Sequence, residues 1–90
     1  MLIRRVTPIF CEHFPQPLIP GALYVSMSKE VVLHLCACGC GVPIVTPLAL
    51  AGWIMVIRPG TLVSLMPPVR NVRGCGSHYW ITDNEVCWIP

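Results

Sequence analysis

The sequence predicts an all-β domain, and three observations carry that prediction. Ten prolines and seven glycines among 90 residues interrupt the chain too often for long helices, because proline removes a backbone donor and clashes with the preceding helical turn. Hydrophobic residues reach 54%, which excludes disorder caused by a lack of apolar content. These residues fall in short runs between the breakers, as strands do. We therefore expect a single domain over residues 1–90, with about six or seven short strands.

The position of each strand follows from the breakers. The runs expected to form strands are 22–26, 31–35, 41–45, 53–57, 62–65, 79–82 and 85–88. Residues 58–61 and residues 83–84 are turn-forming types, and each set is expected to close a hairpin. Thr46 can cap, and Pro47 can begin, one helical turn over residues 46–51.

Composition and charge exclude several functions. Charged residues make up only 11% and the formal net charge is +2, which is too small for a nucleic-acid footprint. Residues 31–57 contain no charged side chain, but their prolines and glycines would break a membrane helix. No apolar leader run precedes Pro8. We therefore expect a cytoplasmic protein that binds neither nucleic acid nor membrane, with its thiols reduced.

Two groups of cysteine and histidine predict a metal site. The first group, at residues 34–40, places His and Cys at alternate positions, which share one face of an extended strand. The second group pairs Cys75 with His78 in C-x-x-H spacing. Thiolate and imidazole ligands together favour tetrahedral Zn²⁺. The simplest ligand set is Cys38, Cys40, Cys75 and His78, with Cys36 and His34 as alternates. Buried thiols with ordinary packing roles and a disulfide framework are the competing interpretations.

The remaining chemistry-bearing side chains are few. Cys11 and Cys87 lie outside both groups and are expected to pack as small hydrophobic residues. The aromatic residues expected to form the core around the metal are Trp53, Trp80, Trp88, Tyr24 and Tyr79. Glu12 is the only plausible general base, because the other carboxylates are scarce and two belong to the turn region at 83–85. Three protein ligands would leave room for a zinc-bound water, whereas four would make the zinc structural. The sequence leaves both open.

Several short runs carry a resemblance to a known family. They are residues 10–12, 21–26, 34–41, 45–48, 63–65, 71 and 75–81. The Cys-rich element at 36–41 and the Cys-Gly-Ser-His-Tyr-Trp-Ile element at 75–81 are the most specific. On these residues the chain resembles the bacterial domain of unknown function 6527 family over nearly its whole length.

That resemblance implies a small cytoplasmic domain found beside bacterial ubiquitin-like proteins and their conjugating enzymes in antiphage-defence gene clusters. It implies a peptidase that trims or removes the ubiquitin-like protein. Glu12, Ser77 and His78 match the family pattern. The chain departs from it at Pro68, where the family tends to carry serine. A nucleophile or substrate-binding hydroxyl at this position would therefore be missing.

Two functions remain. The first is a zinc peptidase acting near the C-terminus of a ubiquitin-like protein, with Glu12 as base and Ser77 orienting the substrate or stabilising the oxyanion. A Ser/Cys variant of it uses Ser77 or Cys36 as nucleophile and His34 as base. The second is a non-catalytic module in which a closed zinc site stabilises the fold and apolar strands add to a partner's sheet edge.

Overall fold

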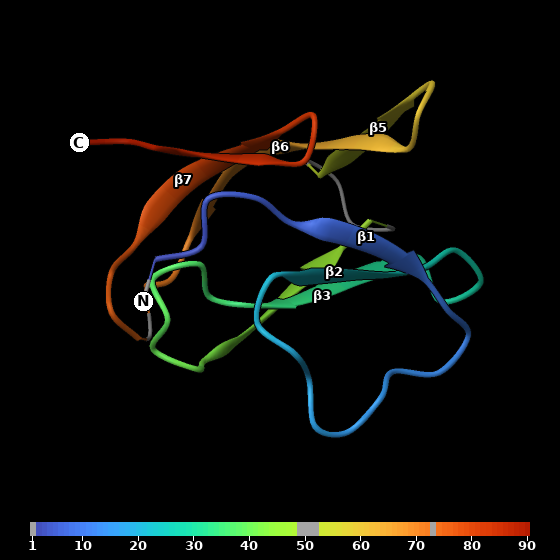
Figure 1. Ribbon diagram of the computed structural model, residues 1–90, viewed down its shortest axis with the longest axis horizontal. Helices are drawn as coiled ribbons and strands as arrows, with labels where there is room; N and C mark the ends of the chain where they lie inside the picture. Colours follow the sequence, from blue (N-terminus) through green and yellow to red (C-terminus); the bar gives the residue numbers. More distant parts are fainter. Residues whose placement is uncertain (1, 49–52, 73) are drawn as a thin grey trace.

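The computed structural model describes residues 2–48, 53–72 and 74–90 and shows two four-stranded sheets (Figure 1). The first sheet has the order β1 (Thr7–Phe10), β2 (Ala22–Ser26), β3 (Val31–Leu35) and β4 (Pro43–Pro47). The second has the order β5 (Ile54–Arg58), β6 (Leu62–Arg70), β7 (His78–Thr82) and β8 (Glu85–Trp88). None of the described residues forms a helix, so the all-β prediction is confirmed. It follows that this part of the chain holds no helix that could cross a membrane.

Most strand predictions agree with the structure, and the differences have local causes. Strands β2, β3 and β8 have the predicted bounds, whereas β6 continues to Arg70 past two prolines because an irregularity in its pairing with β7 accommodates them. Strand β1 was not predicted, since Pro8 interrupts an already short run; in the structure it pairs in parallel with β2. Thr46 and Pro47 end strand β4 instead of starting a helical turn. Residues 49–51 of that predicted turn lie outside the described part.

The two predicted turns are tied together by one side chain. Asp83 and Asn84 both have positive φ, at 48° and 69°, which is the backbone that a two-residue hairpin turn requires. The Asn84 side chain accepts the N–H of Val63 at 2.8 Å and donates to the carbonyl of Thr61 at 2.9 Å. The turn between β7 and β8 therefore holds the hairpin between β5 and β6 in place.

The N-terminal segment connects the two sheets. The carbonyl of Arg4 accepts the N–H of Val86, and Val6 donates to the carbonyl of Asn84. Arg5 forms an isolated antiparallel bridge with Glu85. The chain then enters β1 and pairs with the first sheet, so one extended segment contributes main-chain hydrogen bonds to both sheets.

The hydrophobic core lies between the sheets. Its fully buried members include Leu23, Val25 and Val32 from the first sheet and Val63, Leu65, Val69, Tyr79 and Ile81 from the second. Tyr24 is also buried, where its hydroxyl accepts the N–H of Ile19 at 3.0 Å. The expectation of a core of aromatic residues holds for the two tyrosines, but Trp80 and Trp88 are each 38% exposed. Trp80 faces outward because side chains alternate along a strand and its neighbours Tyr79 and Ile81 point into the core.

Candidate functional site

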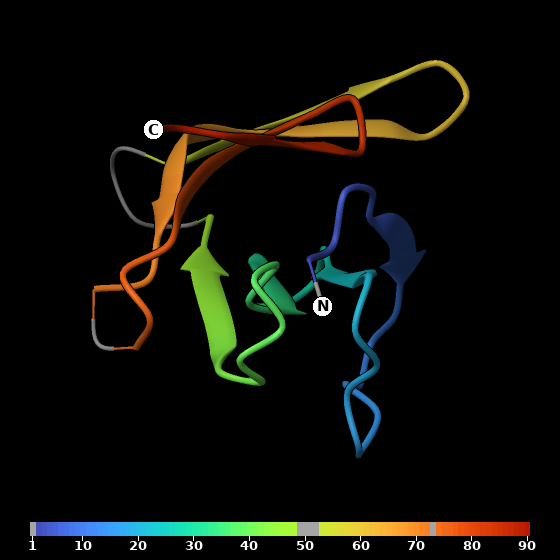
Figure 2. The same ribbon diagram turned by 60° about the vertical axis from the view of Figure 1, so that its left-hand side comes forward.

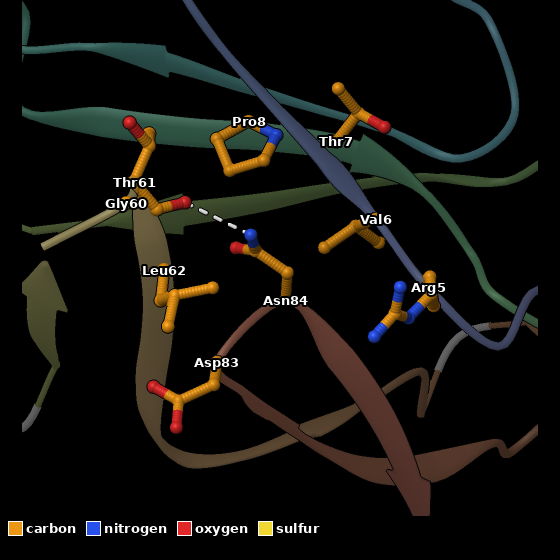
Figure 3. A pocket seen from close by; sticks show the side chains of 9 residues that line it. All are labelled: Arg5, Val6, Thr7, Pro8, Gly60, Thr61, Leu62, Asp83 and Asn84. Atoms are coloured by element: carbon orange, nitrogen blue, oxygen red, sulfur yellow. Dashed lines mark hydrogen bonds between the residues drawn. The ribbon is translucent and has the colours of Figure 1, made fainter. Parts of the chain in front are cut away.

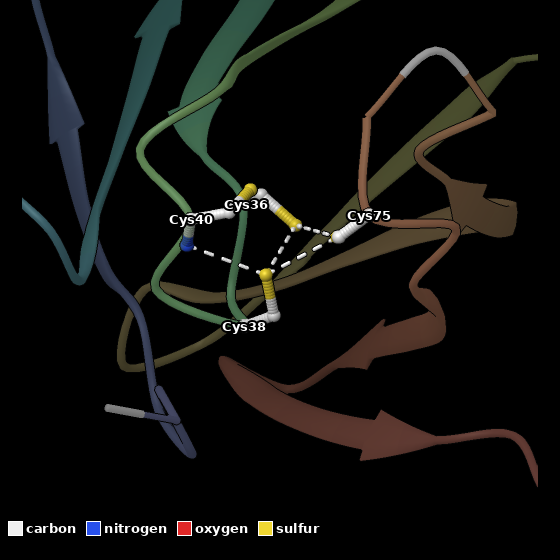
Figure 4. A group of neighbouring side chains, drawn as sticks. All are labelled: Cys36, Cys38, Cys40 and Cys75. Carbon is white, nitrogen blue, oxygen red and sulfur yellow. Dashed lines mark hydrogen bonds between the residues drawn. The ribbon is translucent and has the colours of Figure 1, made fainter.

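Four cysteine sulfurs meet at one end of the molecule. The Sγ atoms of Cys36, Cys38, Cys40 and Cys75 all lie within 4.8 Å of one another (Figure 4). The Sγ of Cys36 is 3.6 Å from those of Cys38 and Cys75, which are themselves 3.2 Å apart. A tetrahedron with metal–sulfur bonds of about 2.3 Å has sulfurs about 3.8 Å apart. The spacing therefore fits one ion held by four sulfurs, and the group can bind a metal.

Two loops from different sheets build this cluster. The first follows β3: Cys36 donates its N–H to Val42, and Gly39 donates to the carbonyl of Cys36. Gly39 has φ of 90°, a conformation that side chains disfavour, and it turns the chain so that Cys40 returns toward Cys36. The second loop lies between β6 and β7 and contributes Cys75. The cluster thus joins the first sheet to the second.

Asn71 organises the second loop from within. It is 4% exposed, and its backbone carbonyl accepts the N–H groups of Gly74 and Gly76. Its side-chain Nδ2 lies 3.6 Å from the Sγ of Cys75 and 3.8 Å from that of Cys40. An N–H donor directed at a thiolate stabilises its negative charge, so Asn71 supports the metal-binding form of both sulfurs.

Replacing Asn71 with alanine is expected to weaken metal binding about 10–100-fold, because both sulfurs lose a donor. Competition against a chromophoric chelator measures this change. Ser28→Ala, which alters an exposed hydroxyl bonded only to Glu12, is the control and should leave affinity unchanged. Equal affinities for Asn71→Ala and the unaltered protein would show that the amide does not act on the sulfurs.

The thiols at the cluster do not titrate alike. The hydroxyl of Ser77, 2.8 Å from the Sγ of Cys75, together with Cys38 lowers the pKa of Cys75 to about 6. The hydrogen bond with Cys75, helped by desolvation, raises the pKa of Cys38 to about 12. The pair therefore shares one proton, with the negative charge on Cys75. A thiolate is the form that binds metal.

Of the six candidate metal ligands, alternates included, the structure gathers the four cysteines and leaves out His34 and His78. The Nδ1 of His78 lies 3.4 Å from an Nη of Arg70, and this histidine is not part of the metal-capable group. Cys36, an alternate on spacing alone, lies in the group instead. Spacing favoured His78 because C-x-x-H is a common metal-binding arm, but at residue 78 the chain has already entered strand β7.

Glu12 lies away from the cluster. Glu12 follows β1, at the end of the first sheet where β2 ends and β3 begins. The hydrogen bond from the N–H of the preceding residue, Cys11, to the carbonyl of Val25 fixes this position. The cluster follows the other end of β3, and five residues of strand span about 16 Å. The Glu12 carboxylate accepts a hydrogen bond from Ser28 at 2.8 Å. In this geometry it does not reach a water on a metal held by the sulfurs.

His34 has a partner that the sequence did not indicate. Its ring is 1% exposed, and its Nε2 lies 2.7 Å from the hydroxyl of Tyr79, which also accepts the N–H of Ala37 at 3.3 Å. The hydroxyl and Nε2 therefore form one buried hydrogen bond that links β3 to β7. Burial lowers the pKa of His34 to about 4, so the ring is neutral at pH 7.

Tyr79 and Asn71 are the two site residues that sequence reasoning missed. Tyr79 packs in the core, as expected of an aromatic residue, but its hydroxyl also contacts His34. Tyr79 contacts His34, and Asn71 contacts Cys40, each more than 30 positions away in the chain. Asn71 also contacts Cys75, which is close in sequence. The only local signal was their position beside the Cys75–His78 motif.

The fold and the site together define a class: a small all-β protein with a four-cysteine group that can hold a metal ion. A family model described as "Bacterial ubiquitination-like system serine protease (BubE)" matches residues 10–89, and the chain belongs to this family. The family name differs from the resemblance drawn from the motifs, but both refer to bacterial ubiquitin-like systems. No curated protein and no solved structure matches the chain significantly.

Proposed function

We propose that this chain is a cytoplasmic peptidase of a bacterial ubiquitination-like system and that it acts at or near the C-terminus of a ubiquitin-like protein. The observation that carries the proposal is the match to the protease family across residues 10–89. A ubiquitination-like system contains a ubiquitin-like protein by definition, and this protein is the substrate in our proposal. The peptide bond at its C-terminal region is the bond that a protease of that system would cleave.

The metal in this proposal is zinc, and its role is structural. Four thiolates are the ligand set of structural zinc sites, and they leave no position for a catalytic water. Bound zinc would offset two of the four thiolate charges and hold the loop after β3 to the loop before β7. Peptide hydrolysis then depends on the protein's own side chains, which agrees with a serine mechanism and not with zinc-activated water.

Ser77 is the serine that this proposal assigns to catalysis. Ser26 is fully buried, the hydroxyl of Ser64 accepts the N–H of Asp83, and that of Ser28 is bonded to Glu12. Ser77 is partly exposed, lies in the loop before β7, and contacts the thiol of Cys75 at 2.8 Å. It combines solvent access with a fixed position at the cluster.

Ser77→Ala is therefore expected to reduce cleavage at least about 100-fold, the typical loss when a catalytic group is removed. The substrate is the ubiquitin-like protein of the same system carrying a short C-terminal extension, and mass spectrometry measures the released peptide. Zinc content and melting temperature are measured on the same variant to show that the fold persists. Undiminished cleavage by this variant would remove Ser77 from the mechanism.

A second candidate function is binding of the ubiquitin-like protein without cleavage, and one observation favours it. All four serines lie in the described part of the chain, and none of their hydroxyls has a histidine as hydrogen-bond partner. Serine nucleophiles are ordinarily activated by such a base. Pro68 moreover stands where the resembled family tends to have serine, next to Val69, which pairs with Tyr79.

Pro68→Ser distinguishes the two candidates. If the chain has lost its nucleophile at this position, the unaltered protein binds the substrate without cutting it, and Pro68→Ser gains cleavage. If Ser77 is the nucleophile, the unaltered protein already cleaves and Pro68→Ser adds little. Pro67→Ser, one position earlier in the same irregular stretch of β6, is the matched control for non-specific effects of removing a proline.

A further inference from the structure

Four strands form the outer edges of the two sheets, and three of these edges are protected. Pro8 lies in β1, and Pro43 and Pro47 lie in β4; proline cannot donate to a new neighbouring strand, so it blocks such pairing. The edge of β8 is covered by the chain's own N-terminal segment, through the hydrogen bond from Val86 to the carbonyl of Arg4.

The edge of β5 is different. Within the described residues, β5 pairs only with β6, so half of its N–H and carbonyl groups point away from the sheet. Residues 54–58 contain no proline and no acidic side chain. Ile54, Val56 and Ile57 are 56%, 38% and 45% exposed. Such an edge accepts a further strand readily, and natural proteins normally protect it.

Apolar side chains continue from this edge across the outer face of the second sheet. Ile54 is the cross-strand partner of Met66, and Met66 follows Leu65, which pairs with Ile81 beside Trp80. Met66 and Trp80 are 39% and 38% exposed. Ile54, Met66 and Trp80 thus form an apolar row beside the edge, where side chains of an added strand can pack.

We propose that the free edge of β5 binds the C-terminal tail of the ubiquitin-like protein as an added strand. The identity of this occupant rests on the proposed function. Main-chain hydrogen bonds to β5 provide affinity, and alternate side chains of the tail pack on the apolar row.

The structure favours an extended tail over a second copy of the chain. The molecule already uses this mode of pairing, since residues 4–6 dock on β8 as an extended segment. A five-residue strand pairing with its copy would bury far less than the roughly 1,200–2,000 Å² of a stable interface. A tail tethered to a folded partner needs no such area, because the rest of that partner supplies further contacts.

The position of β5 also directs the tail toward the proposed site. Ile54 pairs with Met66, and four residues further along β6 Arg70 pairs with His78, the neighbour of Ser77. Four residues of extended chain span about 13 Å. Arg70 is exposed and forms no salt bridge among the described residues. Its guanidinium can therefore receive a carboxylate near the end of the tail.

The test uses the full chain carrying Ser77→Ala, to prevent cleavage, and a synthetic peptide of the tail. Amide resonances of residues 54–58 should shift on binding, and their hydrogen exchange should slow. N-methylation of the peptide should weaken binding about three- to tenfold at alternate positions, because only every second N–H faces β5. Methylation at the intervening positions should have little effect.

Two variants of the protein provide the complementary control. Val56→Lys, on the β5 edge, should weaken binding, whereas Val45→Lys, on the proline-protected β4 edge and 60% exposed, should not. Equal effects of the two variants, N-methylation effects without a period of two, or resonance shifts confined to other strands would overturn the proposal. So would a dimer that forms through β5 and excludes the peptide.

Failure of this proposal is distinguishable from failure of the proposed function. A tail that binds β5 with the alternating pattern, but that the unaltered protein never cleaves, leaves the docking site standing and removes the peptidase. Cleavage by the unaltered protein that is indifferent to Val56→Lys and to N-methylation along β5 leaves the peptidase standing and removes the docking site.

Discussion

Cys36→Ser is expected to release the metal and unfold most of the protein. Cys36 is the only one of the four cysteines that is fully buried, and its Sγ lies 3.6 Å from the Sγ atoms of both Cys38 and Cys75. Structural zinc contributes about 10–16 kcal/mol of apparent binding free energy, which is as large as the whole stability of a typical small domain, about 5–15 kcal/mol. Zinc per chain and circular dichroism at 25 °C measure the loss.

Cys87→Ser is the matched control, because Cys87 is an exposed thiol on β8 outside the metal-capable group. It should retain one zinc and an unchanged melting curve. Treating the unaltered protein with a chelator should reproduce the effect of Cys36→Ser, and added zinc should reverse it. A folded, metal-free Cys36→Ser protein would show that the cluster is not what holds the two sheets together.

Tyr79→Phe is expected to lower the free energy of unfolding by about 2–4 kcal/mol. The substitution removes one oxygen and leaves the ring in place against Trp88, whose centroid lies 5.0 Å away. Without the hydroxyl, the N–H of Ala37 and the Nε2 of His34 are both buried and lack their partner. Urea unfolding of zinc-loaded protein measures the change.

Tyr24→Phe is the control for this loss of stability, because Tyr24 is as deeply buried as Tyr79. Its hydroxyl accepts one N–H, from Ile19 in a partly buried loop, so the expected loss is about 1–2 kcal/mol. A Tyr79→Phe variant that is no less stable than Tyr24→Phe would mean that His34 finds another partner. Thr46 is a candidate for that role, because its hydroxyl and the Nδ1 of His34 are both buried without a hydrogen-bond partner.

Local sequence predicted the strands but not how they assemble. Alternation and turn chemistry place β2, β3 and β8, because hairpins depend on neighbours in the chain. The parallel pairing of β1 with β2 occurs together with a contact of the first residues with β8, between Arg5 and Glu85 across 80 positions. No pattern within a short window carries that information.

The site likewise combines features that local sequence predicts with features that only the folded structure shows. The alternating cysteines after β3 and the distant Cys75 were recognisable as candidate metal ligands from residue type and spacing, and the structure brings their sulfurs together. The sequence did not show that Cys36, and not His78, completes the group of four. That outcome depends on where the loop between β6 and β7 ends and strand β7 begins. The pairing of His34 with Tyr79 links β3 to β7 across the core, and only the packing of the two sheets brings these side chains together.

The uneven distribution of the four sulfurs along the chain sets an order of events during synthesis. Cys36, Cys38 and Cys40 leave the ribosome within five residues of one another, whereas Cys75 follows 35 residues later (75 minus 40). A three-sulfur half-site can therefore form before any strand of the second sheet has emerged. An ion captured there would wait for Cys75, and its arrival would close the loop between the sheets. Metal supply during translation, and not only afterwards, would then determine how much of the protein reaches its folded form.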